Sequence, residues 1–395
     1  MAAGFCVWVV AWGMHQSFGV FFTPLLTEFG WSRAGTVLAY SLLSITQAAV
    51  AIIMGWLTDK LGPRFVVTVF GSFLGISYLL MSQVNALWQF QVNYALVAAI
   101  GFSTTTVPIM ATVARWFVKK RGLMTAIVQA GLGIGGFIFA PMTGWLIINY
   151  GWRSAYSILG IVALVVIIMS GLLLRRQPTD VGQLPGGTSS VGTLAEKEPQ
   201  PGKQATGHSL REAVRTGQFW LVTGLYFSFG FCRSTFLPHI APHTQDLGFS
   251  LSDGANVVAV LTISSIFGRL WMGWLSNKPA FMISYGVTTV ALVWALVTRE
   301  LGGIYLFAAI FGFGWGAQAV LRFTVAAETS GLVSLGLIMG VFTFAEASAG
   351  AFGSFIAGYM FDVFGSYQPA FWMGIPVSIT GILLASFLKL SPKRE

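Results

Sequence analysis

Long apolar stretches recur along the whole chain, and they restrict its possible folds more than any other feature. Each stretch runs for about 20 residues, the length at which an α-helix crosses the hydrocarbon core of a bilayer. They lie at residues 4–26, 34–57, 65–84, 87–114, 122–147, 153–174, 218–240, 252–275, 280–298, 303–325, 331–358 and 367–388. We therefore predict an all-α membrane protein with 12 transmembrane helices.

The composition excludes an ordinary water-soluble protein. Charged residues make up 9% of the chain, against about 25% in soluble domains, and 55% of the residues are hydrophobic. Cys6 and Cys232 both lie in apolar stretches, so we expect neither a disulfide framework nor a Cys-x-x-Cys metal site. No Walker, Gly-x-Ser-x-Gly or His-Glu-x-x-His motif occurs in the sequence. We expect no catalytic residue, no metal and no cofactor, and therefore no enzyme.

A long polar segment at residues 175–217 separates the sixth stretch from the seventh. It is rich in Pro, Gly, Ser, Thr, Glu and Lys, which is typical of a linker. We predict an N-terminal six-helix bundle at residues 1–174 and a C-terminal six-helix bundle at residues 218–395. The first stretch has neither a charged leading region nor a small-residue cleavage site, so we expect a retained helix rather than a signal peptide.

The basic residues set the expected orientation. With the N-terminus inside, the outer loops hold Arg33, Arg153 and Arg299, and the apolar stretches hold Arg233 and Arg269. The remaining 17 of the 22 Lys and Arg residues fall in the inner loops, the linker and the C-terminal tail. This asymmetry follows the positive-inside rule, so the net charge of +9 reflects topology and not nucleic-acid binding. We expect both termini in the cytoplasm.

An internal repeat indicates two homologous halves. Gly-Trp-Leu-Thr-Asp-Lys at residues 55–60 follows the second stretch, and Gly-Trp-Leu-Ser-Asn-Lys at residues 273–278 follows the eighth. Parallel six-helix halves around a site at mid-membrane are typical of secondary transporters that rock between two states.

Two motifs carry a resemblance to known families. Residues 55–64, Gly-Trp-Leu-Thr-Asp-Lys-Leu-Gly-Pro-Arg, resemble the loop motif of the major facilitator superfamily. Residues 116–135, with an aromatic pair, a basic triplet and then spaced glycines, resemble the fifth-helix signature of the monocarboxylate transporter family. The hairpin at residues 19–33 is similar to that family and to the related oxalate:formate exchangers. The resemblance covers nearly the whole chain and implies the fold of the superfamily, with two pseudo-symmetric bundles.

The first motif also implies an inner gate. Charged residues here can pair with helix ends of the neighbouring bundle and hold the inner side shut. They are Asp59, Lys60, Arg64 and Arg121. The alternative is that they are solvated loop charges.

The chain departs from the monocarboxylate transporter pattern at three places. The acidic-Gly-Gly-Trp motif that opens the first helix of that family is absent. Gln16, beside His15, stands where many members carry a lysine. Ser265 stands where animal members carry an acid, four positions before their arginine. The residues for proton coupling must therefore lie elsewhere in this chain.

Two arginines lie inside apolar stretches, where an ionisable residue costs at least ~2.5 kcal/mol on insertion scales. Arg269 matches the arginine that holds the substrate carboxylate in the family, and its planar guanidinium binds a carboxylate through two hydrogen bonds. The alternatives for Arg269 are a structural ion pair or a side chain that reaches the inner surface. Arg233 is either a second anion contact or a residue that reaches the surface, and the sequence favours the latter.

Three residues are candidates for proton coupling. Glu346 lies in an apolar helix, where burial favours the neutral form that a proton carrier needs, although it could instead be a permanent partner of an arginine. The resemblance to oxalate:formate exchangers implies a lysine at this position, so an acid argues against dicarboxylates. His239 and Asp246 share one helical face if the helix continues past Pro238 and Pro242, and ordinary loop polarity is the alternative. Two prolines also favour a broken helix that takes part in gating.

Neutral polar side chains supply the remaining candidates. We expect contacts to the substrate from His15, Gln16, Thr106, Gln129 and Gln318, with hydrogen bonds between helices as the alternative.

Together these features predict a monomeric transporter of the bacterial inner membrane that moves a small, lactate-like monocarboxylate together with a proton. Its partners are the anion, the proton and the lipid bilayer, with no nucleic acid. The alternatives are an anion exchanger of the oxalate:formate type, a membrane sensor or a drug exporter.

Overall fold

The computed structural model describes residues 1–117, 121–176, 210–275, 278–330 and 335–388, and within these ranges it contains helices and no strand. The N-terminal half holds α1 (Ala2–Gln16), α2 (Phe18–Phe29), α3 (Arg33–Leu61), α4 (Pro63–Met81), α5 (Leu87–Val92), a π-helical segment (Asn93–Ala98), α6 (Ala99–Trp116) and α7 (Arg121–Leu173). The C-terminal half holds α8 (Leu210–Ala213), α9 (Gly217–Phe236), α10 (Ile240–Asp246), α11 (Leu251–Leu275), α12 (Lys278–Val297), α13 (Leu301–Ser330), α14 (Leu335–Phe364) and α15 (Gln368–Phe387).

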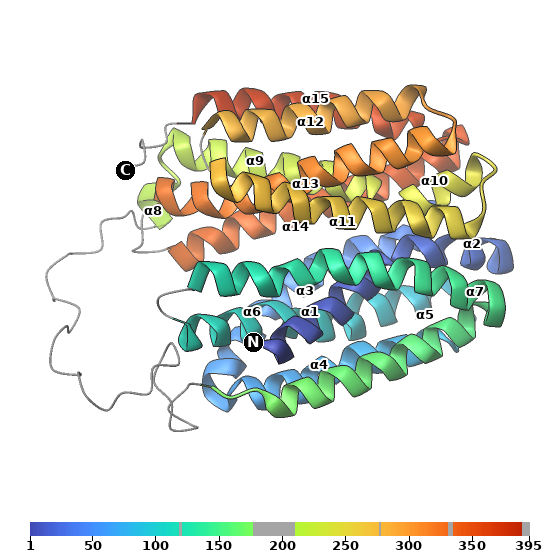
Figure 1. The fold of residues 1–395 in the computed structure, drawn as a ribbon, viewed down its shortest axis with the longest axis horizontal. Helices are drawn as coiled ribbons and strands as arrows, with labels where there is room; N and C mark the ends of the chain where they lie inside the picture. Colours follow the sequence, from blue (N-terminus) through green and yellow to red (C-terminus); the bar gives the residue numbers. More distant parts are fainter. Residues whose placement is uncertain (118–120, 177–209, 276–277, 331–334, 389–395) are drawn as a thin grey trace, which may run out of the picture.

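The helices gather into two groups that follow the two halves of the sequence (Figure 1). In the first half α7 packs against α1 and α4, and in the second half α11 packs against α13 and α9 against α14. The halves meet mainly through α3 with α14 and through α7 with α11. We call the end where α7 stops and α8 starts the linker end, and the opposite end the distal end (Figure 1).

Ten helical segments of the described chain are long and apolar enough to cross a membrane. Leu123–Leu173 is one of them and covers two predicted stretches, because Gly151 at φ 79° turns the chain between two helices that run back to back. The seventh predicted stretch, residues 218–240, is not among the ten. Its helix α9 has 20 residues, long enough to cross a bilayer, but it carries Arg233 and many small polar residues.

The seventh stretch is also not one continuous helix. α9 ends at Phe236 and α10 begins at Ile240, with Pro238 between them. Proline has no backbone N–H and disfavours a helical conformation in the residue before it, which explains the break. The helix therefore does not continue past Pro238; His239 instead caps the start of α10 and Asp246 is its last residue, so both lie at the distal end.

Glycines bring the two halves into close contact. A Cβ atom on Gly136 of α7 would lie 2.5 Å from Thr262 of α11, and one on Gly358 of α14 would lie 3.0 Å from Val37 of α3. A Cβ at Gly136 would require Thr262 to shift, and one at Gly358 would require its neighbours to give by a few tenths of an ångström. Small residues let membrane helices approach and pack by van der Waals contact, so the seams between the halves are tight where these glycines lie.

Candidate transport site and the closure between the halves

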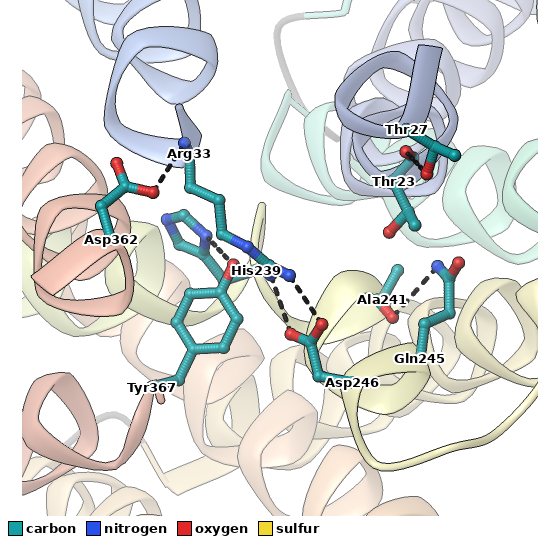
Figure 2. A network of polar contacts seen from close by, with 9 residues as sticks. All are labelled: Thr23, Thr27, Arg33, His239, Ala241, Gln245, Asp246, Asp362 and Tyr367. Carbon is teal, nitrogen blue, oxygen red and sulfur yellow. Dashed lines mark hydrogen bonds and ion pairs between the residues drawn. The ribbon is translucent and has the colours of Figure 1, made fainter. Parts of the chain in front are cut away.

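An ion pair joins the halves at the distal end. Arg33, the first residue of α3, donates from Nη1 and Nη2 to the two carboxylate oxygens of Asp246 at the end of α10, at 2.8 and 2.6 Å. Figure 2 shows the guanidinium of Arg33 pointing at this carboxylate. The two side chains are 13% and 28% exposed, so the pair is only partly screened by solvent. Two parallel bonds of this kind fix geometry as well as charge.

A second carboxylate of the C-terminal half caps α3. Asp362, in the last turn of α14, accepts from the backbone N–H of Arg33 at 2.9 Å and from that of Ala34 at 2.8 Å. The first N–H groups of a helix have no partner inside the helix, and the helix dipole favours a negative charge there. Asp362 therefore satisfies the start of α3 only while the two halves are together.

Tyr367 and His239 extend the contact into the protein. The Tyr367 hydroxyl accepts from Arg33 Nη1 at 2.8 Å and lies 3.1 Å from His239 Nδ1. His239 Nε2 lies 3.0 Å from the carbonyl oxygen of Ser354, which can only accept. A neutral ring with its hydrogen on Nε2 satisfies both contacts, since Tyr367 can then donate to Nδ1. We call Arg33, His239, Asp246, Asp362 and Tyr367 the distal cluster; Figure 2 shows all five side chains.

Burial shifts the pKa of two groups on α10. Burial raises the pKa of the Asp246 carboxyl above its ordinary value, although the hydrogen bonds and charge of Arg33 act in the opposite direction. Burial, with the charges of Arg299 and Arg33, lowers the pKa of His243 to about 4. His243 is therefore neutral at ordinary pH, and Asp246 binds a proton more readily than a solvated aspartate.

Contacts between α3 and α14 continue from the distal cluster toward the middle of the molecule in steps of one turn. Arg33 faces Asp362, Val37 faces Gly358, and the Ser41 hydroxyl lies 2.7 Å from that of Ser354. Residues four apart share one face of a helix, so this single face of α3 is covered by α14 over two turns. The two halves are therefore joined from the distal end to mid-depth.

Arg269 lies in the other seam, between α7 and α11. Its Nη1 donates to the backbone carbonyl of Gln129 at 3.4 Å, a long bond, and its guanidinium carbon lies 5.5 Å from the centre of the Trp315 ring. The Arg269 side chain on α11 thus reaches the N-terminal half, where it contacts the backbone of Gln129. Here the structure brings together two of the residues that the sequence singled out.

The other predicted substrate contacts are more scattered. His15 and Gln16 are buried at the end of α1, and Thr106 is half-buried in α6. The Gln318 amide donates to the Ser284 carbonyl at 3.3 Å and to Thr288 Oγ1 at 2.9 Å, so it is engaged with α12 inside its own half.

Two of the proton-coupling candidates belong to the distal cluster, and the third does not. His239 and Asp246 lie in that cluster. Glu346 is buried in α14, where its backbone packs against Gly230 of α9.

The charges of the predicted inner gate lie at the linker end. Asp59 accepts from Arg115 at 2.7 Å, and both residues belong to the N-terminal half, so the pair does not bridge the halves. Lys60 lies 5.1 Å from the Trp56 ring centre, and Arg64 lines a cavity of about 260 Å³ with other basic residues. The side chain of Arg121 lies outside the part that the structure describes.

Sequence reasoning missed Arg33, Asp362 and Tyr367 as functional residues. Ser32 does cap the start of α3, accepting from Gly35 N at 3.1 Å, which sequence rules could have recognised. The partners across the seam are about 200 to 330 positions away in the chain, and no local pattern links them.

Comparison with known proteins agrees with this architecture. The family model described as Major Facilitator Superfamily matches residues 2–354. Monocarboxylate transporter 13 of Rattus norvegicus is 28% identical over 370 residues, which covers 92% of this chain and 82% of that protein. The oxalate:formate antiporter of Oxalobacter formigenes is 25% identical over 387 residues, covering 95% of this chain and 87% of that protein.

A solved structure shows the same fold. The crystal structure of a bacterial homolog to the human lysosomal transporter Spinster matches with a TM-score of 0.75 at 16% identity, over 98% of this chain and 93% of that chain. The predicted fold class is confirmed, and the relatives named here are transporters rather than enzymes. The chain therefore belongs to the major facilitator superfamily and is an integral membrane transporter.

Proposed function

We propose that the protein carries a small monocarboxylate, of the size of lactate, across the membrane together with a proton. The observation that carries this proposal is the position of Arg269. Its guanidinium lies in the seam between the halves, where it can hold a carboxylate that is exposed first to one side and then to the other. The relatives named as monocarboxylate transporters and as an oxalate:formate antiporter support a small organic anion as the substrate class.

The coupling is electrostatic. A carboxylate neutralises Arg269 during crossing, whereas an empty site needs an ionised acid to offset the same charge. Glu346 and Asp246 are the acids proposed for this role, with His239 in support, because Ser265 replaces the acid of the animal relatives. Protonation of the acid when substrate binds then links the two fluxes.

The two gates have different places in this cycle. With both termini in the cytoplasm of a bacterium, the distal cluster faces outward and closes the outer side. The charged residues that close the inner side are Asp59, Lys60, Arg64 and Arg121. The linker at residues 175–217 connects the bundles at 1–174 and 218–395. His15, Gln16, Thr106 and Gln129 contribute neutral hydrogen bonds to the substrate or to the packing around it. Gln318 contributes packing within its own half.

An anion exchanger of the oxalate:formate type is the second candidate, favoured by the 25% identity to that antiporter over nearly the whole chain. Against it stands Glu346, an acid at the position where the resemblance to the exchangers implies a lysine, since a negative charge there does not favour a dianion. A pH gradient separates the two: both mechanisms allow counterflow without a proton gradient, but only a symporter accumulates substrate in response to a pH gradient alone.

The decisive experiment is uptake of labelled lactate, pyruvate, acetate and oxalate into proteoliposomes, with and without an inward proton gradient. We expect accumulation of a monocarboxylate that needs the gradient. Arg269→Lys keeps the charge but loses the planar fork, so binding should weaken by about 1.5 to 3 kcal/mol, the size of a hydrogen bond to a charged group. Near-normal affinity of the Lys variant would move the substrate site away from Arg269.

A further inference from the structure

Three polar atoms at mid-depth are buried without a hydrogen-bond partner among the described residues. They are Nε of Arg233, Nδ1 of His15 and the hydroxyl oxygen of Tyr40. His15 is 3% exposed and Tyr40 is 1% exposed. Buried polar groups are nearly always hydrogen-bonded, and one left unsatisfied destabilises the protein. Three such atoms in one place indicate a site built for something other than the protein itself.

The three side chains come from both halves: His15 and Tyr40 are in ring contact, with centroids 5.0 Å apart, and Arg233 lies within electrostatic range of both. A Cβ on Gly19 would lie 2.7 Å from the backbone oxygen of Pro238. His15 precedes Gly19, and Arg233 precedes Pro238, by about one helical turn in each case. Because both helices run toward the distal end, His15 and Arg233 lie at the same depth.

The surroundings are aromatic. The ring centroid of Trp12 lies 5.3 Å from that of His15, as does that of Phe102, and the ring centroid of Phe18 lies 5.1 Å from that of Tyr40. Trp12 adds a further indole N–H without a partner among the described residues. Binding sites for small molecules have this composition, with apolar walls and a few polar groups that converge. In an apolar setting a guanidinium requires a counter-charge.

Arg233 is not at the same depth as Arg269. Gly13 of α1, two residues before His15, packs against Gly135 of α7, so this part of α7 marks the depth of Arg233. Gln129, the partner of Arg269, lies on α7 six residues nearer the linker end. Six residues of helix rise about 9 Å. The two arginines therefore lie at successive depths, with Arg233 nearer the distal cluster.

We propose that Arg233, His15 and Tyr40 form a second carboxylate-binding position, which the anion occupies in addition to that at Arg269. Arg233 supplies the charge, Tyr40 donates its hydroxyl hydrogen, and His15 donates from Nδ1 in the tautomer that carries the hydrogen there. The inference rests on the proposed function, because it takes the substrate to be a small monocarboxylate. It makes Arg233 a substrate contact rather than a residue that reaches the membrane surface.

Binding measurements on the purified full-length protein test this position. L-lactate, pyruvate and acetate are titrated by isothermal calorimetry into the wild type, Arg269→Lys, Arg233→Gln, Tyr40→Phe and the control Arg299→Gln. The control removes one exposed arginine at the distal end, outside both positions. We expect Arg233→Gln to raise the Kd at least about tenfold, Tyr40→Phe about threefold or more, and Arg299→Gln less than about twofold.

The outcomes separate the two proposals. If the wild type binds none of the three anions, the proposed function fails. If the wild type binds and Arg269→Lys loses affinity, but Arg233→Gln with a wild-type Tm binds within about twofold, the second position is overturned. Should Arg233→Gln fail to fold, Tyr40→Phe decides, because it keeps the ring and removes only the hydroxyl: an unchanged Kd overturns the proposal, and a weaker one supports it.

Discussion

The distal and linker ends of the molecule use charges in different ways. At the distal end Arg33 of one half binds two acids of the other half, Asp246 through its side chain and Asp362 through its backbone. At the linker end the Asp59 and Arg115 pair lies within a single half. An interaction that bridges two bodies stabilises one of their relative positions, whereas a pair inside one body moves with it and favours neither position. The charges that report on the state of the transporter are therefore those of the distal cluster.

The largest effect should follow from Arg33→Gln. The variant removes the bidentate pair and leaves Asp246 partly buried without its cation. For a pair of intermediate exposure, this should cost the distally closed state about 1 to 3 kcal/mol, between the values for exposed and buried pairs. Spin labels at the exposed Tyr150 and Glu300, one in each half, measure the effect by double electron–electron resonance. The distance distribution should shift toward longer values in the variant, and an unchanged distribution would refute the role of Arg33.

Protonation of Asp246 should favour the distal closure in acid. The pKa of Asp246 is raised by burial in the closed state, so this state takes up a proton more readily than an open state with a solvated carboxyl. The resulting stabilisation is full below the ordinary aspartate pKa, and it is lost as the pH rises through the raised value. The lowered pKa of His243 acts in the opposite direction over this pH range, so the contribution of Asp246 is read from a comparison of two proteins. As the pH falls from 7 toward 4, the same spin-label pair should report a closed fraction that changes more in favour of closure in the wild type than in Asp246→Asn. Identical pH profiles of the two proteins would refute the role of Asp246.

The smallest effect should come from the linker end. Arg115→Gln breaks an exposed pair whose side chains are 33% and 69% accessible, so it should change stability by less than about 1 kcal/mol. The distance distribution at the distal end should stay as in the wild type, because the pair does not bridge the halves. A shift as large as that of Arg33→Gln would remove the distinction between the two ends.

The fold was predictable because the bilayer imposes a simple rule on the sequence. Apolar stretches of helical length and the polar segment between the halves gave an all-helical membrane protein with the architecture of the superfamily. The sequence left open whether the helix continues past Pro238, and the structure ends α9 at Phe236 and starts α10 at Ile240. Arg269 could be singled out because a charge in an apolar helix stands out locally.

The distal cluster could not be predicted in the same way. The sequence places Arg33 in an outer loop and assigns no role to Asp362, because nothing in the residues next to either of them points to a function. Their function arises only where α3 meets α14, and that seam is set by packing across the whole chain. The glycines that allow this approach, such as Gly358, carry no mark in the sequence that names their partner.

Cross-linking across the seam tests most directly whether the distal contact must open during transport. The hydroxyls of Ser41 and Ser354 are 2.7 Å apart on α3 and α14, so cysteines at both positions, with Cys6 and Cys232 changed to alanine, should form a disulfide on oxidation. We predict that the oxidised protein loses monocarboxylate uptake into proteoliposomes and that reduction restores it, while each single cysteine variant is unaffected by oxidant. Undiminished uptake by the fully cross-linked protein would contradict the account, because the two halves would then not need to separate at this seam.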